Sequence, residues 1–106
     1  LPFKDTYNTL LVQDIAYFYT ELKVTWAIQY NKQGHIVPYT LEELEDQLDP
    51  AMFFRANRQY LVSSSSIVAI HNYFNGKLKV MVQPGIKDDL VISRERAAGF
   101  KKWLDR

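Results

Sequence analysis

The segment Phe53-Phe54-Arg55-Ala56-Asn57-Arg58-Gln59-Tyr60-Leu61-Val62 is the most informative stretch of this 106-residue chain. Its apolar ends, residues 53–56 and 59–62, have the composition of two short strands separated by a polar step. The pattern places donor-rich side chains at a strand end, where arginine binds guanine or phosphate and an amide side chain pairs with adenine. The alternative is that Arg55 and Arg58 are surface residues lying over aromatic neighbours. The residues of this segment alone leave both interpretations open.

The sequence before this segment predicts a hairpin followed by an edge strand. Residues 14–19 and 23–30 are rich in β-branched and aromatic side chains, and only Thr20-Glu21-Leu22 links them. A short strand around residues 35–39 follows, and we expect it at a sheet edge because Pro38 cannot donate to a ladder.

A short helix is predicted over residues 41–48. Thr40 and Glu43 have the spacing of a capping box, leucines recur at helical spacing, and Pro50 ends the helix. The other face of this helix is acidic, and we expect it to be solvated and turned away from any polyanion; it carries Glu42, Glu43, Glu45 and Asp46.

The serine run at 63–66 predicts a turn, or a single helical turn closed by its own hydroxyl groups. Beyond it, residues 67–74 and 77–83 flank Asn75-Gly76, a strong signal for a hairpin. In the second of these strands the valines face one way, and Lys77 and Lys79 are expected to face outward.

The end of the chain predicts a last strand and a longer helix. Residues 90–92 form the strand, and Ser93 is expected to cap the helix that follows. The apolar face of this helix holds Ala97, Phe100, Trp103 and Leu104. The predicted fold is therefore mainly β, a single domain over residues 1–106 with a mid-chain helix and a C-terminal helix.

Composition excludes several classes of protein. The chain has no cysteine, which removes disulfides and thiolate metal sites and favours a reducing compartment, the cytoplasm. No apolar run of about 18 residues is present to span a membrane, and no signal peptide is visible. The chain begins with Leu1 rather than methionine, so we expect it to be part of a longer protein. Residues 1–54 carry three basic and eight acidic residues (net −5), and residues 55–106 carry ten and four (net +6). This asymmetry is typical of a polyanion partner, and equally of two differently solvated faces.

The motifs of catalysis are absent. The sequence lacks a glycine-rich phosphate loop, a Gly-x-Ser-x-Gly elbow and a His-Glu-x-x-His pattern. Asp88-Asp89 fits a turn, His35 an exposed turn position and His71 a hydrogen-bonded strand position. We therefore expect no enzyme, no catalytic residue, no metal ligand and no cofactor.

Two arginines stand at an unusual place in the predicted C-terminal helix. Arg94 and Arg96 fall in its first turn, where the helix dipole favours anions and disfavours cations. Glu95 between them offers partial compensation. The other explanation is an external phosphate, held jointly by the free N–H groups of the helix and by the guanidinium groups.

Several stretches in one order resemble the LytTR family of DNA-binding domains, from about Leu11 to the end of the chain. They are DIAYFYTE at 14–21, TLEEL at 40–44, LDP at 48–50, FRANRQYLVS at 54–63 with Ile67, and LVISR at 90–94. No single one of these stretches is diagnostic, but their common order is.

The resemblance implies an elongated fold of small antiparallel sheets with a short mid-chain helix and a C-terminal helix. It also implies sequence-specific binding of double-stranded DNA by loop side chains that touch successive major grooves. Such domains are usually the output half of a two-component transcriptional regulator, with a receiver domain on the N-terminal side. We expect the isolated domain to be a monomer, because the sequence shows no exposed apolar stripe for a dimer seam.

The resemblance also assigns site residues. Arg58 and Arg94 match base-reading positions, and Lys23 and Glu21 lie in the first contact loop, residues 20–23. The other polar residues of the two reading segments complete the expected DNA-binding set: Arg55, Asn57, Gln59 and Arg96.

The chain departs from the family pattern at three positions. Asn57 stands where many members have histidine and Gln59 where many have serine, so we expect a different base preference. Ser63 replaces a frequent asparagine, which affects the capping of that turn. The competing hypothesis is a β-rich protein-interaction or ligand-sensing module whose basic half docks an acidic partner.

Overall fold

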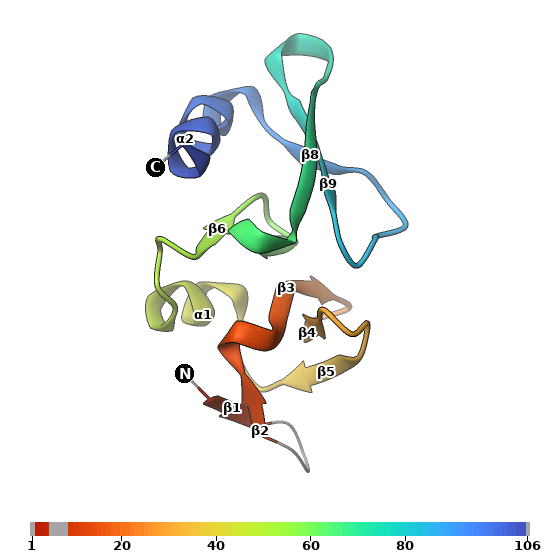
Figure 1. The fold of residues 1–106 in the computed structure, drawn as a ribbon, viewed down its shortest axis with the longest axis vertical. Helices are drawn as coiled ribbons and strands as arrows, with labels where there is room; N and C mark the ends of the chain where they lie inside the picture. Colours follow the sequence, from red (N-terminus) through yellow and green to blue (C-terminus); the bar gives the residue numbers. More distant parts are fainter. Residues whose placement is uncertain (1, 5–8, 106) are drawn as a thin grey trace.

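The molecule is elongated, 43 × 28 × 23 Å, and the computed structural model describes residues 2–4 and 9–105 of it (Figure 1). The strands are β1 Pro2–Lys4, β2 Thr9–Leu11, β3 Ile15–Glu21, β4 Val24–Gln29, β5 Gly34–Val37, β6 Phe53–Arg55, β7 Tyr60–Ser63, β8 Ile67–Asn72, β9 Leu78–Val82 and β10 Leu90–Ile92. The helices are α1 Leu41–Gln47 and α2 Arg94–Leu104, with single 3-10 turns at η1 Val12–Asp14, η2 Ser64–Ser66 and η3 Phe74–Gly76. The mainly β prediction is confirmed.

A five-stranded antiparallel sheet in the order β5-β4-β3-β7-β6 forms the middle of the molecule. Strand β3 is central, and its residues Tyr17 and Phe18 pair with Val62 and Leu61 of β7. Successive residues of a strand point to opposite faces of the sheet. Phe18 accordingly packs in one core with Leu44 of α1, while Tyr17 belongs to a second core on the other side.

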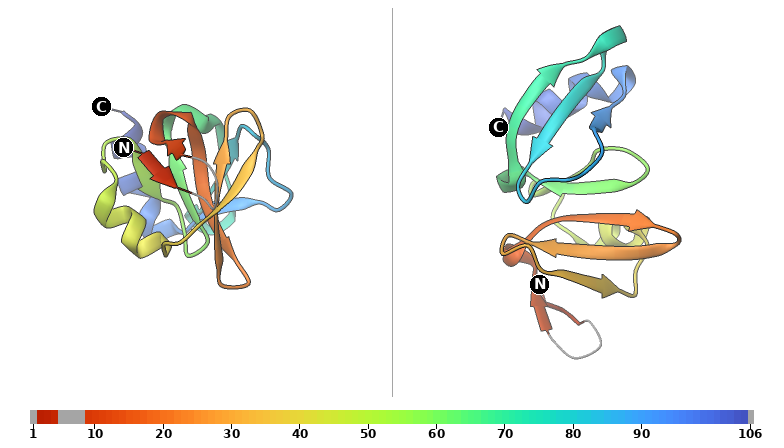
Figure 2. Two further views of the ribbon diagram at one scale, coloured as in Figure 1. Left: turned by 90° about the horizontal axis from the view of Figure 1, so that it is seen from below. Right: turned by 90° about the vertical axis from the view of Figure 1, so that its right-hand side faces the viewer.

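A smaller sheet in the order β10-β9-β8 covers that second core (Figure 2). The alternation of β9 is as predicted, because Leu78, Val80 and Val82 are buried and Met81 is exposed. Helix α2 closes this core with Phe100, which is fully buried. The two cores therefore meet across the five-stranded sheet, and segments from both halves reach a shared surface.

Local signals in the sequence are confirmed in detail. The Thr40 hydroxyl accepts from the Glu43 backbone N–H at 3.1 Å, and the Glu43 carboxylate accepts from the Thr40 N–H at 2.9 Å. In the serine run, the Ser63 hydroxyl accepts from the Ser66 N–H and the Ser66 hydroxyl donates to the Ser63 carbonyl. Both motifs satisfy backbone groups from within four residues of sequence, which is why they could be predicted.

Three local expectations hold only in part. The predicted hairpin is present, but its link is a two-residue turn at Leu22-Lys23 rather than residues 20–22, because β3 continues through Glu21. Ser93 stands at the N-cap of α2, but its side chain makes no capping hydrogen bond within the described part of the chain. His35 lies in β5 rather than in an exposed turn, and its Nε2 is 2.9 Å from Gln29 Oε1.

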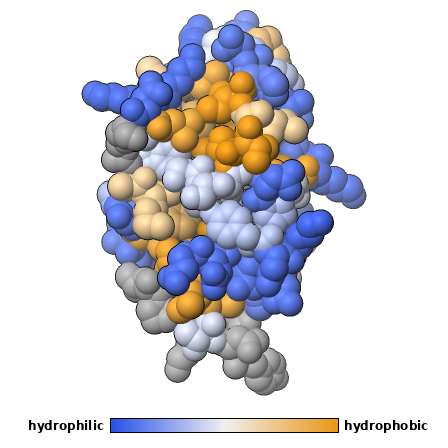
Figure 3. Space-filling model, viewed as in Figure 1, coloured by the Kyte–Doolittle hydropathy of each residue, from blue (hydrophilic) through white to orange (hydrophobic). Residues whose placement is uncertain are grey.

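Apolar side chains gather in the upper half of the molecule, at the edge strand β8 of the smaller sheet (Figure 3). Val68 and Ile70 of this strand are 58% and 37% exposed. Ile70 pairs with the buried Val80 and so lies at the open rim of the core face, whereas Met81 of β9, which is also exposed, lies on the opposite face. The sequence did not reveal this exposed surface, which forms only when β8 becomes an edge. Among the described residues, no helix is long and apolar enough to cross a membrane.

Candidate nucleic-acid interface

The segment between β6 and β7 is built around the side chain of Asn57. Its Oδ1 accepts hydrogen bonds from the backbone N–H groups of Gln59 (2.8 Å) and Tyr60 (3.0 Å). Its Nδ2 donates to the carbonyl of Val91 in β10, at 3.1 Å. Short polar side chains commonly stabilise turns in this way. Asn57 thus shapes the segment and fastens it to the smaller sheet, and its amide oxygen and nitrogen already have protein partners.

Arg55 fixes the same segment from the other side. Its Nε donates to the Asn57 carbonyl at 2.7 Å, and its Nη2 donates to the Arg58 carbonyl at 2.9 Å. The same guanidinium forms ion pairs with Glu45 (2.7 Å) and Glu42 (3.0 Å) of α1. The Arg55 side chain is only 12% exposed. Its donors are therefore directed to the protein rather than outward.

The acidic face of α1 is not turned away from this region. Glu42 and Glu45 reach Arg55, next to Arg58. The Glu42 backbone N–H and the Arg55 guanidinium hold the pKa of the Glu42 carboxyl below its usual value. Both carboxylates are exposed, as expected, but their pairing with Arg55 was not foreseen, because helical periodicity does not reveal which strand end packs beside a helix.

Arg58 is in the opposite situation to Arg55. Its side chain is exposed and forms no ion pair with the carboxylates of residues 9–105. Because Arg55 and Asn57 hold the backbone on either side, the Arg58 guanidinium projects from a fixed base. It lines two grooves, one of about 560 Å³ shared with Lys23 and one of about 650 Å³ shared with Lys77 and Arg96.

The β3–β4 turn beside Arg58 has an unusual backbone. Leu22 and Lys23 have φ values of 51° and 64°, the left-handed region that a two-residue hairpin turn requires and that glycine or asparagine normally fills. Leu22 is 91% exposed at the tip. Strained, exposed residues are common in binding loops. Sequence reasoning missed Leu22, although an apolar residue between Glu21 and Lys23 in a predicted turn was a signal.

The start of α2 holds its two arginines differently. The Arg96 guanidinium donates to the Arg55 carbonyl and lies 5.4 Å from the centre of the Phe54 ring. Arg94 is 72% exposed, with Nε 3.7 Å from the Glu95 carboxylate. Glu95 therefore compensates Arg94 only weakly, since exposed pairs at this distance are worth little.

The stem of Arg94 rests on the β8–β9 hairpin. A Cβ placed on Gly76 would lie 2.9 Å from Arg94 Cγ, and Gly76 also has a φ of +75°. Glycine is therefore required there by both the backbone and the contact. Lys77 follows directly, lies over the Phe74 ring and lines the groove of Arg58, a place that the expectation of an outward-facing side chain did not specify. Lys79 is at a different place and pairs with Asp89 at 3.1 Å.

The structure thus brings most of the expected site residues to one region. Arg58 joins Lys23 on one side and Arg96 on the other, and the Asn57–Val91 bond links this region to the strand before Arg94. Glu21 and Gln59 lie beside it, at the mouth of a separate cavity. The described residues contain no cluster of three or more histidine, aspartate or glutamate residues suited to a metal ion.

Comparison with known proteins agrees with this arrangement. The chain is 28% identical over 105 residues to "Sensory transduction protein LytT" of Bacillus anthracis, an alignment that covers 98% of this chain and 41% of that protein. A 60-residue stretch is 33% identical to the protein of the same description from Oceanobacillus iheyensis, covering 57% of this chain and 24% of the relative. The chain therefore spans less than half the length of these relatives.

The fold is also that of a solved structure. The LytTr DNA-binding domain of a putative methyl-accepting/DNA response regulator from Bacillus cereus superposes with a TM-score of 0.78 at 22% identity, over 100% of this chain and 96% of that one. A family model described as LytTr DNA-binding domain matches residues 5–105. This is a family of DNA-binding domains and not of enzymes. The chain belongs to the LytTr DNA-binding domain family.

Proposed function

We propose that this domain binds double-stranded DNA sequence-specifically, with Arg58 and Arg94 as its base-reading residues. The observation that carries the proposal is the contrast at the β6–β7 segment. Arg55 and Asn57 donate their hydrogen bonds to backbone carbonyls that fix the segment, whereas the Arg58 side chain is exposed and unpaired among residues 9–105. Because the backbone that carries the Arg58 guanidinium is already fixed, DNA binding costs less conformational entropy than it would for a mobile loop. The planar guanidinium fits the O6 and N7 atoms of guanine.

The shape of the molecule suits two adjacent grooves of a duplex. Its 43 Å long axis exceeds the length of one turn of B-form DNA, about 34 Å. The β3–β4 turn, the segment between β6 and β7 and the β8–β9 hairpin all reach the same side of the molecule in the right-hand view of Figure 2. A duplex lying along this side would meet all three.

The remaining residues of the site divide into two groups. We assign Lys23, Glu21 and Gln59 to direct contact with the duplex, together with Lys77, which lines the Arg58 groove. Arg55, Asn57 and Arg96 act as positioning residues, since each donates to a backbone carbonyl of the protein.

The domain is proposed to work as the output half of a cytoplasmic two-component transcriptional regulator, with a receiver domain on its N-terminal side. This proposal is supported by the similarity to proteins described as sensory transduction proteins, of which the chain covers less than half. We propose that the domain itself is monomeric and that repeated half-sites are bridged only by the longer protein.

The experiment that tests the proposal compares Arg58→Ala with Lys101→Ala, a loss of the same charge in the last turn of α2. A duplex selected from a random pool serves as the probe, and affinity is measured by fluorescence anisotropy at several salt concentrations. Loss of a bidentate guanine contact is expected to weaken binding by about 1–3 kcal/mol and to relax preference at one position.

The control variant is expected to bind nearly as the original does. Binding of the original should also weaken with salt, with a slope of about −0.9 per neutralised phosphate. Full affinity in Arg58→Ala would refute the assignment and bring the alternative, a module that docks an acidic protein partner, to the front.

A further inference from the structure

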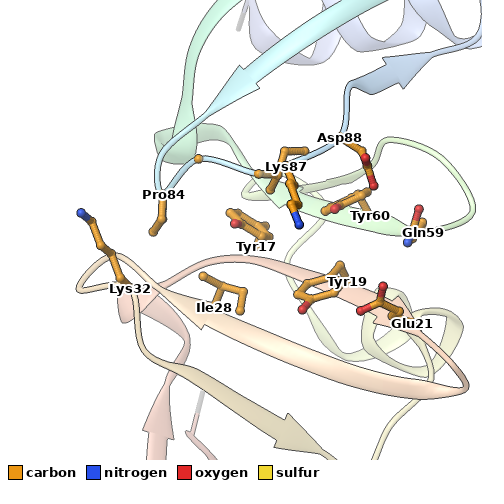
Figure 4. A pocket seen from close by; sticks show the side chains of 12 residues that line it. Tyr17, Tyr19, Glu21, Ile28, Lys32, Gln59, Tyr60, Pro84, Lys87 and Asp88 are labelled. Atoms are coloured by element: carbon orange, nitrogen blue, oxygen red, sulfur yellow. The ribbon is translucent and has the colours of Figure 1, made fainter.

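A separate cavity of about 560 Å³ lies between the five-stranded sheet and the loop that joins β9 to β10 (Figure 4). The sheet contributes one wall from β3, β4 and β7, and residues 84–88 of the loop contribute the other. Its volume is within the range of small-molecule sites in proteins. None of the contacts that hold the Arg58 segment is made by this loop, so the cavity needs an explanation of its own.

Three tyrosines form the wall on the side of the sheet. The rings of Tyr19 and Tyr60 are stacked with centres 5.7 Å apart, and Tyr17 lies 6.0 Å from Tyr60. Tyr17 and Tyr60 are 3% and 8% exposed. The ring of Tyr19, which is only partly buried, therefore supplies the apolar surface of this wall, and Tyr17 and Tyr60 contribute their polar tips.

The hydroxyl groups of these tyrosines have no hydrogen-bond partner among the described residues. Buried hydroxyls are almost always satisfied in folded proteins. In the described part of the chain no fully enclosed polar side-chain atom lacks a partner, so the tyrosine hydroxyls must open on the cavity. The hydroxyl groups of Tyr17 and Tyr60 belong to side chains that are more than nine-tenths buried. They therefore give the cavity hydrogen-bond donors that a ligand with an acceptor group can use.

A positive charge enters the same space from the loop. The Lys87 side chain descends between the rings of Tyr17 and Tyr60 in Figure 4, and it pairs with no carboxylate of the described residues. Asp88 lies directly over Tyr60 in Figure 4, and Glu21 lies beside Tyr19, at the end of the cavity opposite Lys32. The charges of Asp88 and Glu21 lie close enough to Tyr60 to add to the effect of burial, which raises the pKa of its hydroxyl.

We propose that this cavity binds a small aromatic monocarboxylate, with the carboxylate on Lys87 Nζ and on the tyrosine hydroxyls and the ring against Tyr19 and Ile28. An ammonium and hydroxyl donors together match a carboxylate, and hydrogen bonds to an ionised acceptor are the stronger kind. The carboxylates of Glu21 and Asp88 disfavour a dianion such as phosphate. The proposal does not depend on DNA binding and is tested without DNA.

The test is a titration of the ¹⁵N-labelled domain with benzoate and, as a neutral probe of the same shape, benzamide, followed by amide chemical shifts. For a ligand of this size a Kd on the order of 1 mM is expected. Benzoate should produce saturable shifts at residues of β3, β7 and the 84–88 loop. Benzamide should bind about 10-fold more weakly, because it lacks the charge that Lys87 recognises.

Two variants locate the site and one serves as control. Lys87→Gln and Tyr17→Phe should each weaken benzoate binding several-fold, and Lys101→Gln should leave it unchanged. Their amide spectra show at the same time that each variant is folded. The proposal is overturned by equal binding of benzoate and benzamide, by unchanged binding in Lys87→Gln, by inorganic phosphate shifting the same amides as strongly, or by no saturable shift up to about 20 mM.

Discussion

Replacement of Arg55 by methionine removes a guanidinium but keeps most of the aliphatic stem. Four contacts disappear: two hydrogen bonds to the carbonyls of Asn57 and Arg58, and two ion pairs with Glu42 and Glu45. The two carbonyl bonds are worth about 1 kcal/mol each, since the donor is charged but the segment is at the surface. The carboxylates are 71% and 40% exposed, so they regain water and their pairs contribute little more.

The free energy of unfolding should therefore fall by about 2 kcal/mol in Arg55→Met. Urea denaturation measures this as a midpoint lower by about 1 M, taking a slope of about 2 kcal/mol per molar. The matched variant Arg58→Met should unfold as the original does, because Arg58 has no partner among residues 9–105 that its loss would leave unpaired.

Measurements of DNA binding distinguish a positioning role of Arg55 from direct contact of Arg55 with the duplex. Arg55→Met should weaken binding, because the base of Arg58 loosens, but it should leave the slope of log K against log salt unchanged. If Arg55 neutralised a phosphate itself, the slope would fall by about 0.9. Unaltered stability together with a reduced slope would refute the role assigned to Arg55.

Three further outcomes follow from the structure. Gly76→Ala should lose about 1–2 kcal/mol of stability, because φ is +75° and the new Cβ meets Arg94 Cγ, and thermal unfolding measures it. Burial and the neighbouring Tyr60 and Tyr19 raise the pKa of Tyr17 to about 12, above its unfolded value of about 10. The neutral phenol therefore stabilises the fold below pH 10, and this contribution is lost as the pH rises through 12. Urea titrations at pH 8 and pH 11 should show a larger loss in the original than in Tyr17→Phe, by up to about 1 kcal/mol after screening by water in the cavity. Sedimentation should show a monomer at low micromolar concentration, and a dimer abolished by Val68→Lys would instead indicate pairing through the β8 edge.

The sequence by itself determined those elements whose signals lie within a few residues. The capping box of Thr40, the closed serine turn after Ser63, the alternation of β9 and the apolar face of α2 were all predicted and found. Each of these features depends either on hydrogen bonds within one turn or on the regular alternation of apolar and polar side chains along one element. Both kinds of signal involve residues that are close together in the sequence. The order of the sequence stretches between residues 14 and 94 also sufficed to indicate the family, which the family model confirms.

Only the tertiary structure decided which polar residues are free to bind. Arg55 and Arg58 are equivalent donors in the sequence, but α1 supplies carboxylates to the first and none to the second. Asn57 bonds a carbonyl 34 residues away. Arg94 rests on Gly76, and the tyrosine cavity joins strands to a loop far along the chain. These contacts follow from the register of the two sheets and the packing of the helices on them, and no local pattern encodes them because their energy arises only when distant surfaces are brought together.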